Sequence, residues 1–159
     1  MICEYITYRV VALLKEKNWH ITFAESCTGG LAAAELVSVS GASNVFEGSF
    51  ITYADSAKLR LLQVEQTSVD RCGVVSEEVA LQMAQGACSQ MDAQVGVGIS
   101  GIAGPTGATE GKPVGTVCFA FVLPNMQYTV TRQFGDIGRN KVQQESVRFV
   151  MKMLMQLLE

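Results

Sequence analysis

Apolar residues recur along this chain with two periods, one typical of helices and the other typical of strands. Residues 3–17 place apolar side chains three or four positions apart, which predicts an amphipathic helix. Residues 20–24 form a short run rich in β-branched and aromatic side chains, which predicts a strand. By the same criteria, further helices are predicted over residues 31–39, 54–62, 76–90 and 139–158, and further strands over residues 46–53, 93–100, 114–123 and 127–134.

The order of these elements predicts the α/β class, as a three-layer α/β/α sandwich with a mixed, mostly parallel sheet. Helices and strands alternate over most of the chain, and this order places helices on both faces of a sheet. The last two strands are joined near Pro124-Asn125, so a hairpin makes the sheet mixed. No linker, internal repeat or low-complexity segment divides the sequence, which predicts a single domain over residues 1–159.

Composition indicates a globular protein with a weakly charged surface. Hydrophobic residues make up 48% of the chain and charged residues 17%, and the formal net charge is −3. There is no basic run and no apolar run of about 18 residues, so neither a nucleic acid nor a membrane is an expected partner. Residues 1–5 lack the basic region and cleavage site of a signal peptide, and we therefore expect a cytoplasmic protein.

The five cysteines are scattered and form no Cys-x-x-Cys pair. No His or Asp cluster has the spacing of metal ligands, so we expect no metal, no cofactor and no disulfide framework. The cysteines are expected to be buried free thiols, with Cys27 as the one placed to take part in chemistry. The single histidine, His20, stands at the opposite end of its predicted strand from Ser26, so a serine nucleophile here needs a different base.

Residues 24–30, with the sequence Ala-Glu-Ser-Cys-Thr-Gly-Gly, connect a predicted strand to a predicted helix. Backbone N–H groups at the start of a helix bind anions or a developing oxyanion. Gly29 and Gly30 would let that backbone approach a ligand closely. The same residues also fit a plain helix cap, in which the hydroxyl groups and glycines serve only the turn. These residues alone favour neither interpretation.

A second strand end, residues 52–58, carries two candidate site residues. Tyr53 could donate a hydrogen bond or stack on an aromatic ligand. Lys58 could act as the base for a serine, because a lysine removed from water loses its proton more readily. Each residue also fits a structural role, Tyr53 in strand packing and Lys58 on a solvated helix face.

The third candidate segment is the loop of residues 100–113, which is rich in Gly and Pro. Its backbone N–H groups and small side chains suit a phosphate or a sugar, although the spacing is not that of a P-loop. An irregular segment of this length is unusual in a compact domain unless it has a function. Arg139, at the start of the last helix, fits either a phosphate ligand or a surface arginine. If the strands are parallel, all three segments meet at one edge of the sheet.

Four motifs occur in a fixed order: Ala-Glu-Ser-Cys-Thr-Gly-Gly at 24–30, Thr-Tyr through Ala-Lys at 52–58, Gly-Val-Val-Ser-Glu-Glu-Val-Ala at 73–80, and Ser-Gly-Ile-Ala-Gly-Pro through Lys-Pro-Val-Gly-Thr at 100–116. Over nearly its full length the chain therefore resembles the CinA C-terminal domain family of competence/damage-inducible proteins, whose stand-alone members are nicotinamide-nucleotide amidases. The resemblance implies hydrolysis of the carboxamide of nicotinamide mononucleotide (NMN), a step of pyridine nucleotide salvage that gives nicotinate mononucleotide and ammonia. It also implies a metal-free protein that is commonly a homodimer.

The same resemblance implies roles for individual residues. Ser26 would be the nucleophile and Lys58 its base, with Tyr53 beside them. Backbone N–H groups near Cys27 would hold the oxyanion, and the Gly-rich loop and Arg139 would meet the ribose and phosphate. The residues expected to bind the substrate are Cys27, Thr28, Gly29, Gly30, Ser100, Gly101, Gly104 and Arg139.

The chain departs from the family pattern in three places. Asp55-Ser56 stands where the family usually has Asn-Glu, Ala108 replaces a glycine, and residues 135–139 look lengthened. A carboxylate at Asp55 would weaken a phosphate site or raise the pKa of the nearby lysine. These departures motivate an alternative to the serine amidase, namely a catalytically weak or inactive member that binds a pyridine nucleotide or a protein partner. A separate alternative is a cysteine amidase that uses Cys27.

Overall fold

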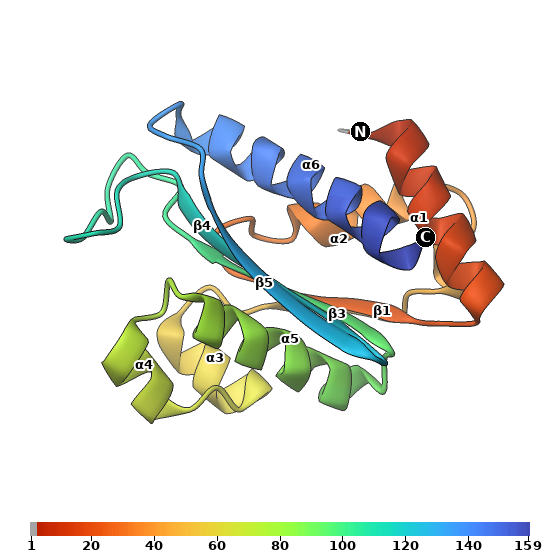
Figure 1. Ribbon diagram of the computed structural model, residues 1–159, viewed down its shortest axis with the longest axis horizontal. Helices are drawn as coiled ribbons and strands as arrows, with labels where there is room; N and C mark the ends of the chain where they lie inside the picture. The colour runs from red at the N-terminus through yellow and green to blue at the C-terminus, as the bar shows by residue number, and fades with distance from the viewer. Residues whose placement is uncertain (1–2) are drawn as a thin grey trace.

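The computed structural model describes residues 3–159. We expect a cytoplasmic protein from the sequence of residues 1–5. Of these, Met1 and Ile2 lie outside the described residues. Five strands form one sheet with helices on both faces (Figure 1). The strands are β1 (Ile21–Glu25), β2 (Phe50–Ile51), β3 (Val95–Gly101), β4 (Thr116–Leu123) and β5 (Met126–Gln133). The helices are α1 (Glu4–Lys17), α2 (Leu31–Val37), the short 3-10 helix η1 (Ala42–Asn44), α3 (Asp55–Leu62), α4 (Gln66–Cys72), α5 (Glu77–Met91) and α6 (Arg139–Leu158).

The sheet is mixed and has the strand order β2-β1-β3-β4-β5. β1 runs parallel to β2 and β3, whereas β4 is antiparallel to β3 and β5. Figure 1 shows α1, α2 and α6 on one face of the sheet and α3, α4 and α5 on the other. The three-layer α/β/α sandwich with a mixed sheet is therefore confirmed. Parallel and antiparallel pairings are equal in number, because β4 returns antiparallel to β3 before it forms the predicted hairpin with β5.

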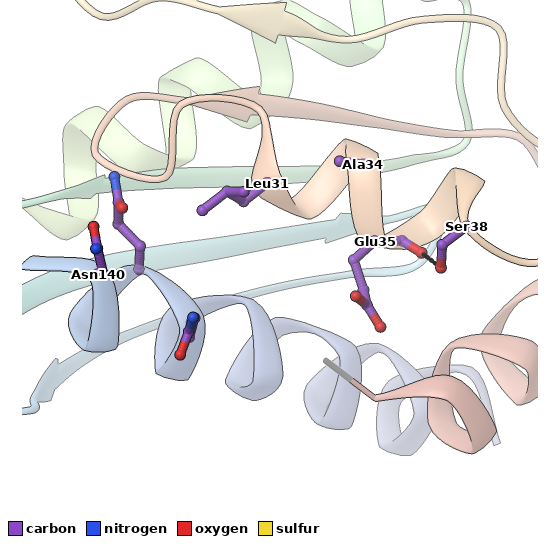
Figure 2. A pocket seen from close by; sticks show the side chains of 7 residues that line it. Leu31, Ala34, Glu35, Ser38 and Asn140 are labelled. Carbon is purple, nitrogen blue, oxygen red and sulfur yellow. Dashed lines mark hydrogen bonds between the residues drawn. The ribbon is translucent and has the colours of Figure 1, made fainter. Parts of the chain in front are cut away.

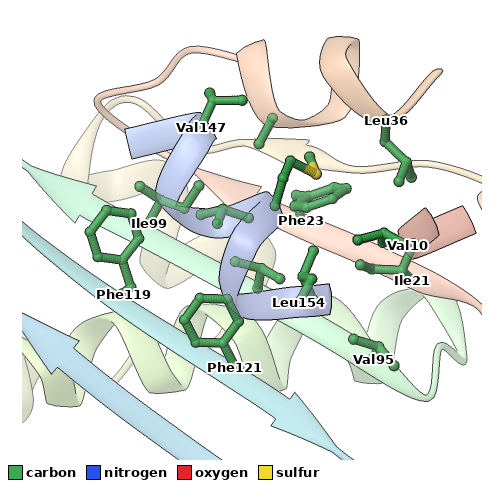
Figure 3. Close-up of a cluster of buried hydrophobic side chains, with 14 of the residues drawn as sticks. Val10, Ile21, Phe23, Leu36, Val95, Ile99, Phe119, Phe121, Val147 and Leu154 are labelled. Carbon is green, nitrogen blue, oxygen red and sulfur yellow. The ribbon is translucent and has the colours of Figure 1, made fainter. Parts of the chain in front are cut away.

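The larger hydrophobic core lies between the sheet and the layer of α1, α2 and α6 (Figure 3). Phe23, Ile99 and Phe119 come from three neighbouring strands and are fully buried there, together with Leu154 of α6. Burial of each such side chain stabilises the fold by about 1.5–3 kcal/mol. This packing holds α6 against the sheet and thereby fixes the position of its first residue, Arg139.

On the opposite face, α5 packs directly on β3 because glycines remove the side chains that would separate them. A methyl group at Gly98 would overlap the carbonyl oxygen of Ala80, and one at Gly96 would come too close to the carbonyl oxygen of Ala84. Met83 is fully buried in the same layer. The helix backbone thus lies against the strand, and the end of β3 is fixed relative to the start of α5.

The carboxyl ends of β1, β2 and β3 meet at one edge of the sheet. Ser26 follows β1, Thr52 follows β2, and Gly101 ends β3. This confirms that the three candidate segments meet at one edge, as parallel strands require. His20 precedes β1 and so lies at the opposite end of that strand from Ser26.

Two elements differ from the sequence prediction. The strand predicted over residues 46–53 is only two residues long, because after one isolated bridge between Phe46 and Ile21 the chain leaves the ladder until Phe50. Helix α4 was not predicted, because its seven residues are mostly polar and bury only Ser68 fully. No helix within residues 3–159 is long and apolar enough to cross a bilayer.

The long loop after β3 is more ordered than its composition predicts. Thr109 and Lys112 exchange two backbone hydrogen bonds and form a tight turn at the loop tip. The Nζ of Lys112 then donates a 2.7 Å hydrogen bond to the carbonyl of Cys72 at the end of α4. The loop is therefore tied across to the α3–α5 layer.

Candidate active site

Lys58 and Ser26 lie in hydrogen-bond contact where the sheet edge meets α3. The Nζ of Lys58 donates to Ser26 Oγ at 3.1 Å, to the carbonyl of Thr52 at 2.9 Å and to the carbonyl of Tyr53 at 3.3 Å. The lysine side chain is 1% exposed and the serine 9% exposed. The contact arises because α3 starts directly after β2 and points its second turn back toward the end of β1.

The oxygen partners of Lys58 fit either protonation state. An ammonium can donate one N–H group to each of Ser26 Oγ and the carbonyls of Thr52 and Tyr53. A neutral amine can donate its two N–H groups to the two carbonyls, and its lone pair can then accept the hydroxyl proton of Ser26 in place of the donation to Ser26 Oγ. Burial lowers the pKa of Lys58 from its usual 10.5, because a site poor in water disfavours the charged form.

Asp55 opposes this effect. Its Oδ1 lies 3.7 Å from the Nζ of Lys58, and a carboxylate at this distance favours the ammonium form and so raises the pKa of Lys58. The Asp55 side chain is 62% exposed, so water weakens its influence. The pKa of Lys58 stays lowered, because burial is the larger of the two effects.

The turn after β1 is held by a buried carboxylate, that of Glu25, which is fully buried. It accepts hydrogen bonds from Thr28 Oγ1 at 2.7 Å and from the backbone N–H groups of Gly30 at 3.0 Å, Ala32 at 3.1 Å and Ala33 at 2.9 Å. The negative charge thus caps the N-terminus of α2 from within the protein. The donors expected there for an external anion are occupied by this side chain.

Thr28, Gly29 and Gly30 therefore do not line the cavity next to Ser26, although the resemblance implies that they bind the substrate. The Thr28 hydroxyl and the Gly30 N–H donate to the buried carboxylate, and the Gly29 N–H donates to the carbonyl of Ser26 at 3.1 Å. The backbone N–H groups of Cys27 and Thr28 donate to no other residue within the described part of the chain. These two N–H groups directly follow Ser26 in the chain, and of the two residues Cys27 lines the cavity.

Cys27 has a different role from the one that the thiol alternative requires. Its side chain is 5% exposed and belongs to the core cluster above the sheet. Burial raises the pKa of its thiol to about 12, so the reactive thiolate is strongly disfavoured at neutral pH. Its carbonyl accepts a 2.8 Å hydrogen bond from Gln143 Nε2 of α6. The sulfur of Cys27 therefore packs in the core, and its carbonyl is bound to α6.

A cavity of about 300 Å³ opens above Ser26 and Lys58. Eight of the eleven residues predicted for the site line it, and only the three residues of the α2 cap do not. The sequence analysis did not assign Val74, Val75, Ile102 or Thr106 to the site, although they lie within or beside two of its motifs. The complete lining is Ser26, Cys27, Tyr53, Asp55, Lys58, Val74, Val75, Ser100, Gly101, Ile102, Ala103, Gly104, Thr106, Gly107 and Arg139.

Arg139 reaches this cavity from the start of α6, despite the lengthened segment before it. One guanidinium nitrogen donates to the carbonyl of Gly104 at 2.9 Å, and the other donates to the hydroxyl of Tyr53 at 2.6 Å. The Tyr53 side chain is exposed at the rim. Ser100 is buried, and its hydroxyl donates to the carbonyl of Val74 at 2.7 Å, so it ties β3 to the segment before α5.

A second cavity, of about 460 Å³, lies between α2 and α6 (Figure 2). Leu31, Glu35 and Asn140 line it, and the Glu35 carboxylate accepts hydrogen bonds from the Cys3 N–H and the Thr7 hydroxyl of α1. This cavity is larger but contains neither Ser26 nor Lys58. The smaller cavity is therefore the candidate active site. Within residues 3–159, no group of three His, Cys, Asp or Glu residues is arranged to hold a metal ion.

Comparison with known proteins identifies the family of the chain. The family model of the CinA C-terminal domain matches residues 4–158. The chain belongs to this family. The crystal structure of the competence/damage inducible protein CihA from Agrobacterium tumefaciens superposes with a TM-score of 0.96 at 36% identity, covering 100% of this chain and 97% of that one.

Curated members of the family differ in length. The nicotinamide-nucleotide amidohydrolase PncC of Enterobacter agglomerans is 39% identical over 144 residues, which cover 91% of this chain and 88% of that protein. A CinA-like protein of Fervidobacterium nodosum is 47% identical over 116 residues, which cover 73% of this chain and 28% of that protein. The chain thus spans about a third or less of the length of CinA-like relatives such as this one.

Proposed function

We propose that this protein is a nicotinamide-nucleotide amidase that hydrolyses NMN to nicotinate mononucleotide and ammonia. The observation that carries the proposal is the 3.1 Å contact between the buried Lys58 Nζ and Ser26 Oγ at the floor of an open cavity. A serine beside a neutral lysine is an activated nucleophile that needs no histidine. The name of the PncC relative, which this chain matches over most of both lengths, supports an amide bond of a nicotinamide nucleotide as the target.

In the first half of the reaction, Ser26 Oγ attacks the amide carbon while Lys58 takes the hydroxyl proton. The carbonyl oxygen becomes an oxyanion, and we assign its stabilisation to the N–H groups of Cys27 and Thr28, which have no acceptor in another residue within residues 3–159. Lys58 then gives its proton to the amide nitrogen, the C–N bond breaks, and ammonia leaves. Ser26 now carries the nicotinoyl group as an ester.

The second half returns the enzyme to its starting state. Lys58, neutral again, takes a proton from a water molecule, and the hydroxide formed attacks the ester carbon. The C–O bond to Ser26 breaks, and Lys58 returns the proton to Ser26 Oγ. One water is consumed, and the products are nicotinate mononucleotide and ammonia. The same two side chains therefore serve both steps.

The remainder of the cavity would bind the rest of the nucleotide. Tyr53 and Ser100 stand beside the nucleophile, where the pyridine ring must lie. Gly101 and Gly104 belong to the loop that we assign to the ribose and phosphate. Arg139 carries the cation placed at the rim for the phosphate. A homodimer and a cytoplasmic location stay predictions from the sequence and the family resemblance.

Ammonia release from NMN, measured on purified protein without added metal, tests the proposal. Ser26→Ala and Lys58→Met should each lower the rate at least about 100-fold, because each removes a group that bonds to or takes a proton from the reacting atoms. Ser43→Ala and Lys152→Met remove the same groups from exposed positions and should leave the rate unchanged.

Two outcomes would contradict the proposal. Turnover that survives Ser26→Ala or Lys58→Met would exclude this pair as nucleophile and base. Calorimetric binding of NMN by folded protein that releases no ammonia would favour the alternative, a family member that binds a pyridine nucleotide without hydrolysing it.

A further inference from the structure

Asp55 places a carboxylate in the cavity beside the reacting groups. Its Oδ1 is 3.7 Å from the Nζ of Lys58, which in turn is 3.1 Å from Ser26 Oγ. Asp55 also lines the cavity and keeps most of its side chain exposed to it and to solvent. A ligand whose reacting carbon touches Ser26 therefore comes close to this negative charge.

The protonation state of Lys58 decides whether the Asp55 carboxylate has a cationic partner. With Lys58 as an ammonium, the carboxylate has a cation within ion-pair distance. The neutral amine that the base role requires offers no such charge. Arg139, the other cation of the cavity, is held by the Gly104 carbonyl and the Tyr53 hydroxyl. In the working state, Asp55 lacks a cationic partner next to the nucleophile.

The proposed substrate supplies a cation at this place. A nicotinamide ring joined to ribose through its ring nitrogen is a pyridinium ion, and its positive charge is delocalised over the ring. The ring is one bond away from the amide carbon that Ser26 attacks. Once that carbon reaches Ser26 Oγ, the charged ring must lie in the cavity that Asp55 and Tyr53 line. An aromatic side chain at the same rim offers a further favourable surface to a cation.

We propose that Asp55 is a specificity-determining residue, whose carboxylate pairs with Lys58 in the free protein and with the pyridinium ring in the complex. The inference rests on the proposed function and deepens it, because it names the residue that would make the site prefer a cationic ring. The exchange has a chemical consequence. A cation that takes over the Asp55 carboxylate withdraws the support for the ammonium form, so substrate binding drives the proton from Lys58 and generates the base.

The other groups that face Lys58 do not provide this exchange. From the turn after β1, the Cys27 thiol remains protonated, because burial raises its pKa to about 12. From α6, the Arg139 guanidinium lines the same cavity but already has two partners. From the start of α3, Asp55 raises the pKa of Lys58 against the lowering by burial. Removal of the Asp55 carboxylate should therefore change the balance between the ammonium and the neutral form of Lys58.

Calorimetry on the inert Ser26→Ala variant tests the inference without turnover. The two ligands are NMN and its 1,4-dihydro form, which share the phosphate, the ribose and the carboxamide but differ in ring charge. We expect Ser26→Ala to bind NMN more tightly than the dihydro form. Adding Asp55→Asn should reduce this preference by about threefold or more, the scale of an ion pair near the surface. Adding Asp92→Asn, an exposed change at the far end of α5, should leave it unchanged.

Proton release gives a second, independent readout. Binding heats measured at one pH in two buffers of different ionisation enthalpy should show that NMN releases part of a proton. The dihydro form should release none, and Lys58→Met should abolish the release. Two results would overturn the inference. One is a preference for NMN over the dihydro form that is the same with and without Asp55→Asn. The other is equal binding of the two ligands by the Ser26→Ala protein that keeps Asp55.

Failure of the inference and failure of the proposed function are distinguishable. If Ser26→Ala does not bind NMN and the unmodified protein releases no ammonia from it, the proposed function is wrong and the inference falls with it. If ammonia is released and NMN binds, but Asp55→Asn leaves the preference for the charged ring intact, only the role of Asp55 is wrong.

Discussion

The guanidinium of Arg139 donates a 2.6 Å hydrogen bond to the hydroxyl of Tyr53, although 86 positions separate the two residues in the chain. The same guanidinium holds the carbonyl of Gly104 in the long loop. The Arg139 side chain therefore connects three segments that line the cavity: the start of α6, the connection from β2 to α3, and the loop after β3. Ser26 and Lys58 line the same cavity as these three residues.

Arg139→Ala should weaken substrate binding more than it slows the reaction. It removes the cation at the rim and the link to Tyr53, so we expect KM for NMN to rise about tenfold, the effect of losing one charge-assisted contact, while kcat changes less. Tyr53→Phe keeps the ring and removes only the hydroxyl, and should raise KM less. Steady-state ammonia release measures both. A fall in kcat at unchanged KM would place Arg139 in the chemical step instead.

The rate should rise with pH as Lys58 loses its proton. Burial lowers the pKa of Lys58, so the rise in kcat/KM should occur below 10.5. Asp55 acts in the opposite direction, so Asp55→Asn should move the rise to lower pH. A pH–rate profile of each protein measures the shift. Superimposable profiles would show that the carboxylate does not influence the base.

Lys58 should also make stability depend on pH. Between the lowered pKa of folded Lys58 and 10.5, the unfolded chain binds more protons, so the free energy of unfolding rises with pH in that window. Lys58→Met should remove this contribution and be more stable at neutral pH by about 1 kcal/mol or more, because the folded protein no longer has to bury the ammonium or deprotonate it. Urea unfolding of both proteins at matched pH tests this. A Lys58→Met protein that is less stable at neutral pH would contradict it.

Cys27→Ala should separate the two candidate nucleophiles. Because the sulfur packs in the core, the change should lower the free energy of unfolding by about 1–2 kcal/mol. Because the thiol stays protonated, the rate of ammonia release should remain close to that of the unmodified protein. Loss of turnover in a folded Cys27→Ala protein would restore the cysteine mechanism.

Glu25→Gln should damage both stability and rate. The buried carboxylate accepts from one hydroxyl and three backbone N–H groups, and an amide must turn its own donor toward some of them. We expect a loss of about 2–3 kcal/mol in the free energy of unfolding. We also expect a lower kcat, because Ser26 is the next residue. Glu16→Gln removes an exposed carboxylate of α1 and is the matched control. Unchanged kcat in a folded Glu25→Gln protein would show that the cap does not position the nucleophile.

The sequence correctly predicted most features that depend on residues close together in the chain. The spacing of apolar residues predicted all but one of the main helices, and the position of the Ser26, Lys58 and loop segments after strands correctly predicted that they meet at one edge. Helix α4 escaped because mostly polar residues carry no clear apolar period. The short β2 escaped because residue type alone does not show where a strand leaves its neighbour.

The α2 cap shows why part of the site could not be predicted. The sequence shows glycines and a helix start, which is the usual pattern of an anion site. Whether those N–H groups face outward depends on where the neighbouring side chain points, and Glu25 turns back to take them. Likewise, the burial of the Cys27 sulfur depends on the packing of α6 above it, from more than a hundred residues further along.

The close contact of β3 with α5 also determines how the cavity can open. With Gly98 against the backbone of Ala80, there is no compressible layer of side chains between strand and helix, and neither can slide without the other. Ser100 at the end of this strand also ties the segment of Val74 and Val75 to it through a hydrogen bond to the Val74 carbonyl. The loop on the other side of the cavity is held at its tip by the Lys112 side chain. In the proposed reaction, we therefore expect any widening of the cavity to come from this loop and not from the strand and helix, which leave Ser26 and Lys58 in place.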